Sequence, residues 1–135
     1  MTLAGGCYCG AVRYEADGPV FNATLCHCSD CRRVSGAPAV GWFSVASGAL
    51  RYTRGAPRAF RSSPRVLRAF CGHCGTTLTW QHEDEPNEID VTICSLDDAD
   101  AVAPQDHVYT ASAVRWLHLA DGLPRFPRSR SAGNG

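Results

Sequence analysis

The sequence predicts an all-β fold built from short antiparallel strands with minor helical turns. Several short stretches alternate apolar and polar residues, most clearly "EIDVTIC" at 88–94, and a period of two is the pattern of a half-buried strand. Turn signals separate these stretches, among them "DGP" at 17–19, "SG" at 47–48 and "SP" at 63–64. No internal repeat, low-complexity block or linker divides the 135 residues, so we expect one domain.

The first half of the chain contains four expected strands, over 11–16, 20–25, 39–45 and 49–53. The second of these strands leads directly into a cysteine-rich loop. Residues 29–36, "SDCRRVSG", are expected to form one helical turn or a little more. Ser29 or Asp30 is the expected N-cap and Gly36 the expected stop, because these residue types favour helix ends.

The middle of the chain predicts a hairpin followed by a tight turn. Residues 58–62 and 65–70 are expected to pair around a Ser-Pro turn. Residues 71–82, "CGHCGTTLTWQH", are expected to begin as a tight knuckle and to continue as a strand. Alternation along this strand places Leu78 and Trp80 on one face.

The last third of the chain is less regular. Strand 88–94 is expected to turn three apolar side chains inward, those of Ile89, Val91 and Ile93. Residues 95–102 predict a short helix or turn, and the pattern of 106–119 is ambiguous. We expect a single catalytic domain over 1–127 and a flexible tail over 128–135.

The charge balance argues against a nucleic-acid-binding protein. Thirteen arginines, with no lysine, balance thirteen acidic residues, whereas nucleic-acid binding needs a clear basic excess. Six arginines lie between 51 and 68 and nine acids between 83 and 106. The ordinary interpretation is solvated strand faces and loops; the alternative is that an arginine binds a substrate carboxylate.

The chain offers no sign of a membrane segment. No apolar run reaches the ~18–20 residues that a membrane span needs. The first ten residues, "MTLAGGCYCG", contain neither a basic nor a long apolar stretch, so we expect no signal peptide. The expected compartment is the cytoplasm, where thiols stay reduced and disulfides are rare.

The eight cysteines indicate metal binding. Seven of them lie in short clusters of the kind that surround a metal ion. Cys7 and Cys9 form a C-x-C pair, and Cys71 and Cys74 form a C-x2-C pair. Gly72 and Gly75 flank the second pair and can adopt a positive φ without cost. Together the two pairs predict a four-thiolate structural zinc site.

The other cluster is "CHCSDC", with cysteines at 26, 28 and 31. Cys26 and Cys28 share a side if the chain is extended, and Cys31 follows on the next turn, so all three sulfurs can face one ion. Three protein ligands with one vacant position are typical of a catalytic zinc. The alternative is a closed structural site whose fourth ligand is Cys94, His27, Asp30 or a distant histidine.

The remaining cysteine and two histidines have ordinary interpretations. His27 lies between two ligands in an extended stretch and should point away from them. Cys94 ends an amphipathic strand and is expected to be a small buried residue rather than a ligand. His73, between two knuckle cysteines, is expected to face solvent.

Four motifs together resemble one known family. "GGCYCGAVRY", "CHCSDCRRVSG", "FCGHCGTTL" and "DGLPRF" occur in this order over nearly the whole chain. The chain is similar in these motifs to the glutathione-dependent formaldehyde-activating enzymes. The resemblance implies a β-tent fold containing two zinc ions. It assigns four cysteines to a structural zinc and three to a catalytic zinc, namely Cys7, Cys9, Cys71 and Cys74, and Cys26, Cys28 and Cys31.

The resemblance also implies an activity, that of a carbon–sulfur lyase of the S-(hydroxymethyl)glutathione synthase type. A thiol such as glutathione would lose its proton at the three-cysteine zinc and add to formaldehyde or a similar small carbonyl. Glutathione carries two carboxylates, so Arg32 and Arg33 are candidate substrate contacts. The family has a similar H-x-Y and tryptophan in the segment of His107, Tyr109 and Trp116, which makes these residues further candidates.

Two alternatives to this activity stay open at the level of sequence. One is a non-enzymatic interaction module, stabilised by zinc, in which both sites are closed. The other is different carbon–sulfur chemistry at the same open zinc.

Overall fold

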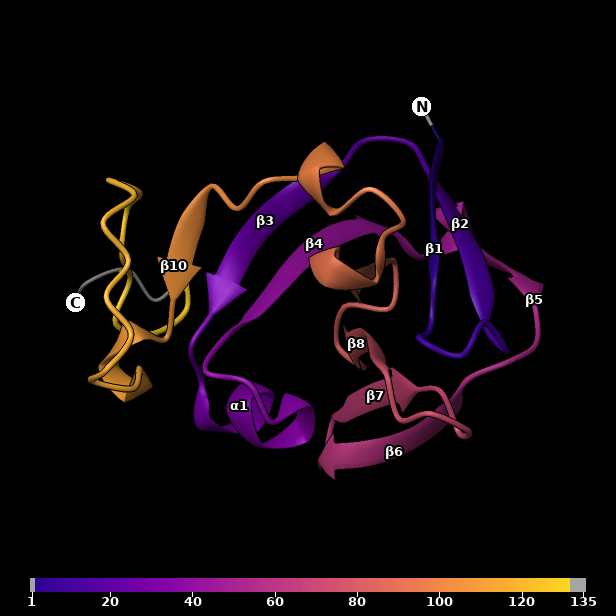
Figure 1. The fold of residues 1–135 in the computed structure, drawn as a ribbon, viewed down its shortest axis with the longest axis horizontal. Helices are drawn as coiled ribbons and strands as arrows, with labels where there is room; N and C mark the ends of the chain where they lie inside the picture. The colour runs from indigo at the N-terminus through magenta and orange to yellow at the C-terminus, as the bar shows by residue number, and fades with distance from the viewer. Residues whose placement is uncertain (1, 132–135) are drawn as a thin grey trace.

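The structure, a computed structural model, describes residues 2–131 as two packed β-sheets (Figure 1). The smaller sheet has three antiparallel strands in the order β1-β2-β5. The larger sheet has seven strands in the order β10-β3-β4-β9-β8-β7-β6. Its neighbouring strands are antiparallel, except that β10 runs parallel to β3. The predicted all-β class is therefore confirmed.

The strands of the smaller sheet are β1 (Thr2–Gly6), β2 (Arg13–Asp17) and β5 (Leu50–Arg54). Those of the larger sheet are β3 (Phe21–Cys26), β4 (Val40–Ala46), β6 (Arg58–Ser63), β7 (Val66–Phe70), β8 (Thr77–His82), β9 (Glu88–Thr92) and β10 (Asp106–Val108). The helical elements are α1 (Ser29–Ser35) and the 3-10 turns η1 (Ser47–Ala49), η2 (Ile93–Ser95), η3 (Ala99–Ala101) and η4 (Thr110–Ser112). Within the described part of the chain, no helix has the length and apolar character to cross a membrane.

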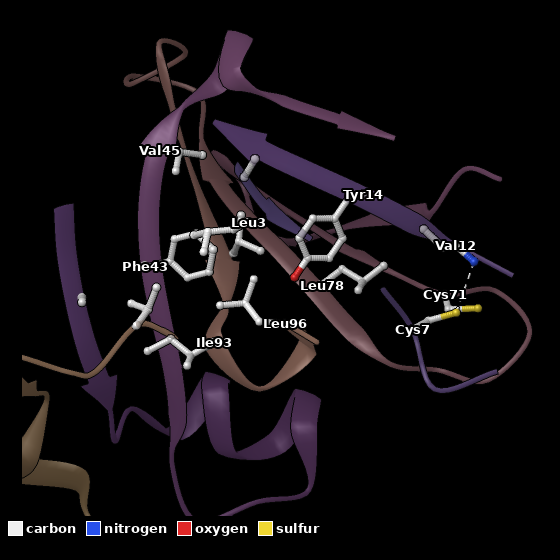
Figure 2. Close-up of a cluster of buried hydrophobic side chains, with 14 residues drawn as sticks. Leu3, Cys7, Val12, Tyr14, Phe43, Val45, Cys71, Leu78, Ile93 and Leu96 are labelled. Carbon is white, nitrogen blue, oxygen red and sulfur yellow. Dashed lines mark hydrogen bonds between the residues drawn. The ribbon is translucent and has the colours of Figure 1, made fainter. Parts of the chain in front are cut away.

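The hydrophobic core lies between the two sheets (Figure 2). The smaller sheet contributes Leu3 and Tyr14, and the larger sheet contributes Phe43, Leu78 and Val91. Each such side chain contributes about 1.5–3 kcal/mol when fully buried. The core therefore uses only one face of the seven-stranded sheet.

The period-two pattern correctly predicts buried residues of β9 but fails in β8. The β6–β7 hairpin is confirmed, and Val91 and Ile93 are buried as expected. Leu78 and Trp80, however, do not share a face: Leu78 is in the core, whereas Trp80 lines a cavity on the other side. A register shift between β7 and β8 lies beside Leu78, and such a β-bulge breaks the period of two.

The helix α1 begins at Ser29, the start of the predicted stretch, but its N-cap lies one residue earlier than predicted. Its N-cap is Cys28, whose sulfur accepts a hydrogen bond from the backbone N–H of Cys31, so neither Ser29 nor Asp30 caps it. The expected stop is confirmed, because Gly36 adopts the left-handed conformation with φ of 64°. The N-cap and the first turn of α1 thus supply two cysteines of the cluster, Cys28 and Cys31.

The second face of the seven-stranded sheet carries a row of polar and aromatic side chains that crosses four strands. Ser44 on β4 pairs with Asp90 on β9, which pairs with Trp80 on β8, which pairs with Arg68 on β7. Residues directly opposite on neighbouring strands point to the same face. This face, away from the core, forms the floor of the candidate site.

Candidate metal centres and the cavity beside them

The four-cysteine cluster joins distant parts of the chain. Cys7 and Cys9 lie in the turn between β1 and β2, and Cys71 and Cys74 lie in the turn between β7 and β8. Their four sulfur atoms all lie within 4.8 Å of one another. The cluster therefore links the three-stranded sheet to the β7–β8 turn of the seven-stranded sheet.

The surroundings of this cluster suit thiolates. The backbone N–H of Val12 donates to the Cys7 sulfur at 3.2 Å, and that of His73 donates to the Cys71 sulfur at 3.4 Å. Hydrogen bonds from Thr76 lower the pKa of Cys74 to about 5. Four sulfurs that accept hydrogen bonds and face one point are the donor set of a structural zinc. The side chain of His73 is exposed, as expected.

The two glycines of the knuckle have different roles. Gly75 adopts a φ of +81°, as the sequence predicted. Gly72 does not have a positive φ; instead a Cβ there would lie 2.6 Å from Cδ of Arg58. Gly72 therefore lies close to the exposed side chain of Arg58, which can move, whereas Gly75 is needed for its backbone conformation.

The three-cysteine cluster is local in sequence. Cys26 ends β3, Cys28 caps α1 and Cys31 lies in its first turn. The sulfurs lie within 4.8 Å of one another, with those of Cys26 and Cys31 3.4 Å apart. Hydrogen bonds from the Cys26 and Cys31 thiols lower the pKa of Cys28. The three sulfur atoms can therefore face one metal ion.

No fourth ligand joins this cluster among residues 2–131. Asp30 lines the neighbouring cavity but does not belong to the cluster, and the ring of His27 is bonded elsewhere. Cys94 belongs to neither cluster and is exposed, so its expected burial is wrong. Cys94 lies in the 3-10 turn η2, beyond the end of β9 at Thr92 and directly after the buried Ile93. Because consecutive residues of a strand point to opposite faces, an alternation that turns Ile93 inward already places Cys94 outward.

Two buried histidines support the loop from behind. His27 Nε2 lies 2.9 Å from His107 Nδ1, and His107 Nε2 lies 2.7 Å from Asp121 Oδ2. A carboxylate can only accept a hydrogen bond, so His107 donates to Asp121 from its Nε2. The Nδ1 of His107 then accepts the hydrogen bond that Nε2 of His27 donates. The unpaired Nδ1 of His27 is then a lone pair rather than an N–H. Burial lowers the pKa of His27 and keeps it neutral.

A cavity of about 670 Å³ lies beside the three-cysteine cluster. All three cysteines line it, and its walls include Trp42, Trp80 and Val108. A volume of this size is ordinary for a small-molecule site, for which ~300–1,000 Å³ is typical. The open side of the cluster therefore faces a space large enough for a substrate.

Arg68 lies at the cysteine end of this cavity and is only 3% exposed. Its Nε donates to the hydroxyl of Ser62 at 3.0 Å, and its two terminal nitrogens lie 4.0 and 3.9 Å from the Cys31 sulfur. The guanidinium group thus contacts the cluster directly.

The cavity also contains carboxylates. Burial raises the pKa of Asp90 to about 6, although the hydrogen bond from Ser44 at 2.5 Å opposes this shift. The hydrogen bond with Glu85 raises the pKa of Glu88 to about 7. Arg130 is also among the lining residues and forms an ion pair with Asp106, which lies on β10 outside the cavity.

Most of the predicted substrate contacts lie outside the cavity. Arg32 and Arg33 lie on α1 and do not line the cavity. His107 is completely buried behind the cysteine loop, and Trp116 is 69% exposed. Tyr109 does line the cavity, with a left-handed backbone. The structure thus lends no support to contacts through Arg32, Arg33 or His107, which remain predictions.

Sequence reasoning missed the residues that form the floor of the cavity. Asp90, Trp80 and Arg68 come from different strands, and only the pairing register brings them together. The single sequence signal is the alternation in β4, which places Trp42 and Ser44 on one face.

These features define an all-β protein of the β-tent class with two cysteine clusters suited to zinc. The sequence model of the glutathione-dependent formaldehyde-activating enzyme family matches residues 2–112, and the chain belongs to that family. A solved structure of a Rhodobacter sphaeroides protein is similar in fold, with a TM-score of 0.58 and 23% identity over 92% of this chain and 99% of that one. No curated protein sequence matches the chain.

Proposed function

We propose that the protein is a zinc-dependent carbon–sulfur lyase of the S-(hydroxymethyl)glutathione synthase type. Its substrates are glutathione, or a related thiol, and formaldehyde or a similar small carbonyl. The observation that carries this proposal is the three-cysteine cluster, which has no fourth ligand among the described residues and lines a cavity. Membership of the family supports the same substrates.

The donor sets of both clusters fit zinc. Four sulfurs form the complete ligand set of a structural site, whereas three leave a position for substrate. A zinc ion at Cys26, Cys28 and Cys31 supplies Lewis acidity, which favours the thiolate form of a thiol that binds there. We therefore propose two zinc ions per chain.

The chain's own residues orient the two substrates. Trp42 and Trp80 provide apolar walls against which a small carbonyl can lie while the cavity excludes water. The thiol sulfur forms a bond to the carbonyl carbon, and the carbonyl oxygen takes up the proton that the thiol has lost. Because the reaction needs no oxidant and no leaving group, the main contribution of the site is orientation.

The charged groups of the cavity suit a ligand with charges of both signs. Asp90 has no ion-pair partner among residues 2–131, so it is available to an ammonium group. Arg130, although paired with Asp106, lines the cavity and can contact a carboxylate. Glutathione carries both kinds of group. We place the reaction in the cytoplasm, since all eight cysteines are free.

A direct assay tests the function. Zinc-loaded protein is mixed with glutathione and ¹³C-labelled formaldehyde, and formation of the S-hydroxymethyl adduct is followed by NMR against the spontaneous rate. We expect a faster reaction with the wild-type protein and only the spontaneous rate with Cys28→Ser. A wild-type rate no faster than the spontaneous one, with two zinc ions bound, would favour the interaction module. Acceleration with a different carbonyl only would favour other carbon–sulfur chemistry.

A further inference from the structure

Arg68 is a buried cation with no carboxylate partner within the described residues. The ion pairs of the structure neutralise five other arginines, namely Arg13, Arg51, Arg61, Arg65 and Arg130. Arg68 is more buried than any of these five, yet its contacts are the Ser62 hydroxyl and the Cys31 sulfur. A buried charge is costly unless it is paired, and the Cys31 sulfur is the anion-forming group that Arg68 contacts among the described residues.

The fork of Arg68 is held in a fixed orientation. Ser62 accepts from Nε, which turns both terminal nitrogens toward the Cys31 sulfur. In the sheet, Arg68 lies opposite Trp80 on one neighbouring strand and Phe60 on the other. The guanidinium is thus held beside the cluster and is not a mobile surface group.

The net charge of the three-cysteine site with a bound zinc ion explains how this contact can help a thiol to bind. Three thiolates around a divalent zinc leave a net charge of about −1, and a fourth thiolate from a substrate brings it to about −2. The positive charge of one adjacent guanidinium changes these net charges to about 0 and about −1. Because charges interact strongly inside a protein, the second negative charge is much easier to accept beside Arg68.

The four-cysteine cluster provides a comparison within the same molecule. Its sulfurs accept hydrogen bonds from the backbone N–H groups of Val12, His73 and Cys74 and contact the Thr76 hydroxyl. No arginine side chain donates to those sulfurs among residues 2–131. Among residues 2–131, a guanidinium that directly contacts a clustered sulfur is therefore found at the cluster that faces the cavity, whereas Arg13 interacts with Cys7 only by charge.

We propose that Arg68 is a positioning residue that compensates the charge of the Cys26/Cys28/Cys31 site and so allows it to bind a fourth, anionic sulfur ligand. This inference rests on the proposed function, since it requires a substrate thiol at that site. It differs from a carboxylate contact, because the effect of Arg68 should not depend on the charges elsewhere in the thiol.

Cobalt(II)-substituted protein allows thiol binding to be measured without formaldehyde. The visible bands of cobalt report a new sulfur ligand, and the dissociation constant is obtained at one fixed pH. Two thiols are compared: glutathione, which carries carboxylates, and 2-mercaptoethanol, which does not. The variants are Arg68→Gln, which removes the charge but keeps a hydrogen-bond donor, and Arg68→Lys, which keeps the charge. Arg61→Gln on the exposed neighbouring strand is the matched control.

We expect Arg68→Gln to bind both thiols about ten- to a hundredfold more weakly, the effect of losing one charge-assisted contact. Arg68→Lys should stay within about threefold of wild type and Arg61→Gln should be unchanged. Weakening of glutathione alone would overturn the proposal in favour of a carboxylate contact, and unchanged affinity for both thiols would also overturn it.

Two further outcomes are informative. If Arg68→Gln does not fold, Arg68→Lys decides: retained affinity supports compensation by charge, and a loss of more than about tenfold overturns it. If wild-type cobalt protein binds neither thiol, the proposed function itself fails, and this inference fails with it. Wild-type binding with no effect of Arg68 would contradict the inference alone.

Discussion

At the scale of single residues, the buried carboxylate of Asp90 lines the candidate site at a cost to the stability of the fold. Its carboxylate lies in the cavity without a cationic partner among residues 2–131, and burial raises its pKa to about 6. In the unfolded chain an aspartate has a pKa of about 3.9. The folded protein therefore keeps a proton that the unfolded chain releases between about pH 4 and pH 6, and the free energy of unfolding falls over that window.

Replacing this carboxylate should stabilise the protein. Asp90→Asn keeps an oxygen for the Ser44 hydroxyl but removes the charge. We expect the free energy of unfolding to rise by on the order of 2 kcal/mol at pH 7.5. At pH 4 the rise should be well under ~1 kcal/mol, because there the folded carboxyl is protonated and the unfolded one is only about half ionised. Urea denaturation at the two pH values measures the difference.

A control of opposite sign is available at Asp97. Arg13 lowers the pKa of this exposed carboxyl, so Asp97→Asn should not stabilise the protein at neutral pH. An Asp90→Asn variant that is less stable than wild type at pH 7.5 would mean that the carboxylate has a compensating partner in solution.

The residues that could be predicted from sequence are those whose chemistry is encoded by local spacing. Seven cysteines divide as four and three in the structure, as their spacing indicated. Arg68 and Asp90 could not be found in this way, because an isolated arginine or aspartate in a strand carries no spacing signal. The burial of Cys94 was predicted wrongly because it rested on the residue type, whereas alternation with the inward-facing Ile93 places Cys94 outward.

At the scale of elements, the knuckle between β7 and β8 depends on one backbone conformation. Gly75 has a φ of +81°, and its backbone N–H donates to the carbonyl of Cys71 at 2.8 Å. A Cβ at Gly75 would have nothing within 4 Å. The requirement for glycine is therefore conformational and not steric.

Gly75→Ala should consequently destabilise the protein without a clash. A non-glycine residue in the left-handed region costs roughly 1–2 kcal/mol, so we expect a loss of about that size in the zinc-loaded protein. Gly75→Asn should lose less, since asparagine tolerates this conformation better. Thermal unfolding and zinc content of both variants check this, and an alanine variant as stable as the asparagine variant would argue against a conformational cause.

Most elements were predictable because they carry a clear alternation or a clear stop signal. The β6–β7 hairpin and the glycine that ends α1 are examples. The face of Trp80 was not predictable, since the β-bulge beside Leu78 arises from pairing with β7 and leaves no mark in the sequence of β8. The cap of α1 was missed because the Cys28 sulfur takes the role that serine or aspartate usually has.

At the scale of the whole molecule, the two cysteine clusters differ in what they connect. The four-cysteine cluster joins the β1–β2 turn to the β7–β8 turn, so it links the two sheets across a long stretch of sequence: Cys71 lies 62 positions after Cys9. The three-cysteine cluster joins the end of β3 to the helix that follows it, and Cys31 lies only five positions after Cys26. Closing a long loop costs more chain entropy than closing a short one, so more of the fold depends on the first cluster.

The two clusters should therefore fail differently when one sulfur is removed. Binding energies of structural zinc are on the order of 10–16 kcal/mol, comparable to the ~5–15 kcal/mol stability of a whole domain. We expect Cys74→Ser to give insoluble or unfolded protein, because the sheets lose their link. Cys28→Ser should stay folded, retain one zinc ion per chain and lose activity, because its cluster organises only a local loop and the substrate site. Circular dichroism, elemental analysis and turnover of the two variants, compared with the two zinc ions expected in wild type, test this difference. Equal collapse of both variants would show that the three-cysteine loop is also structural, and would revive the closed-site interpretation with a fourth ligand that the described residues do not supply.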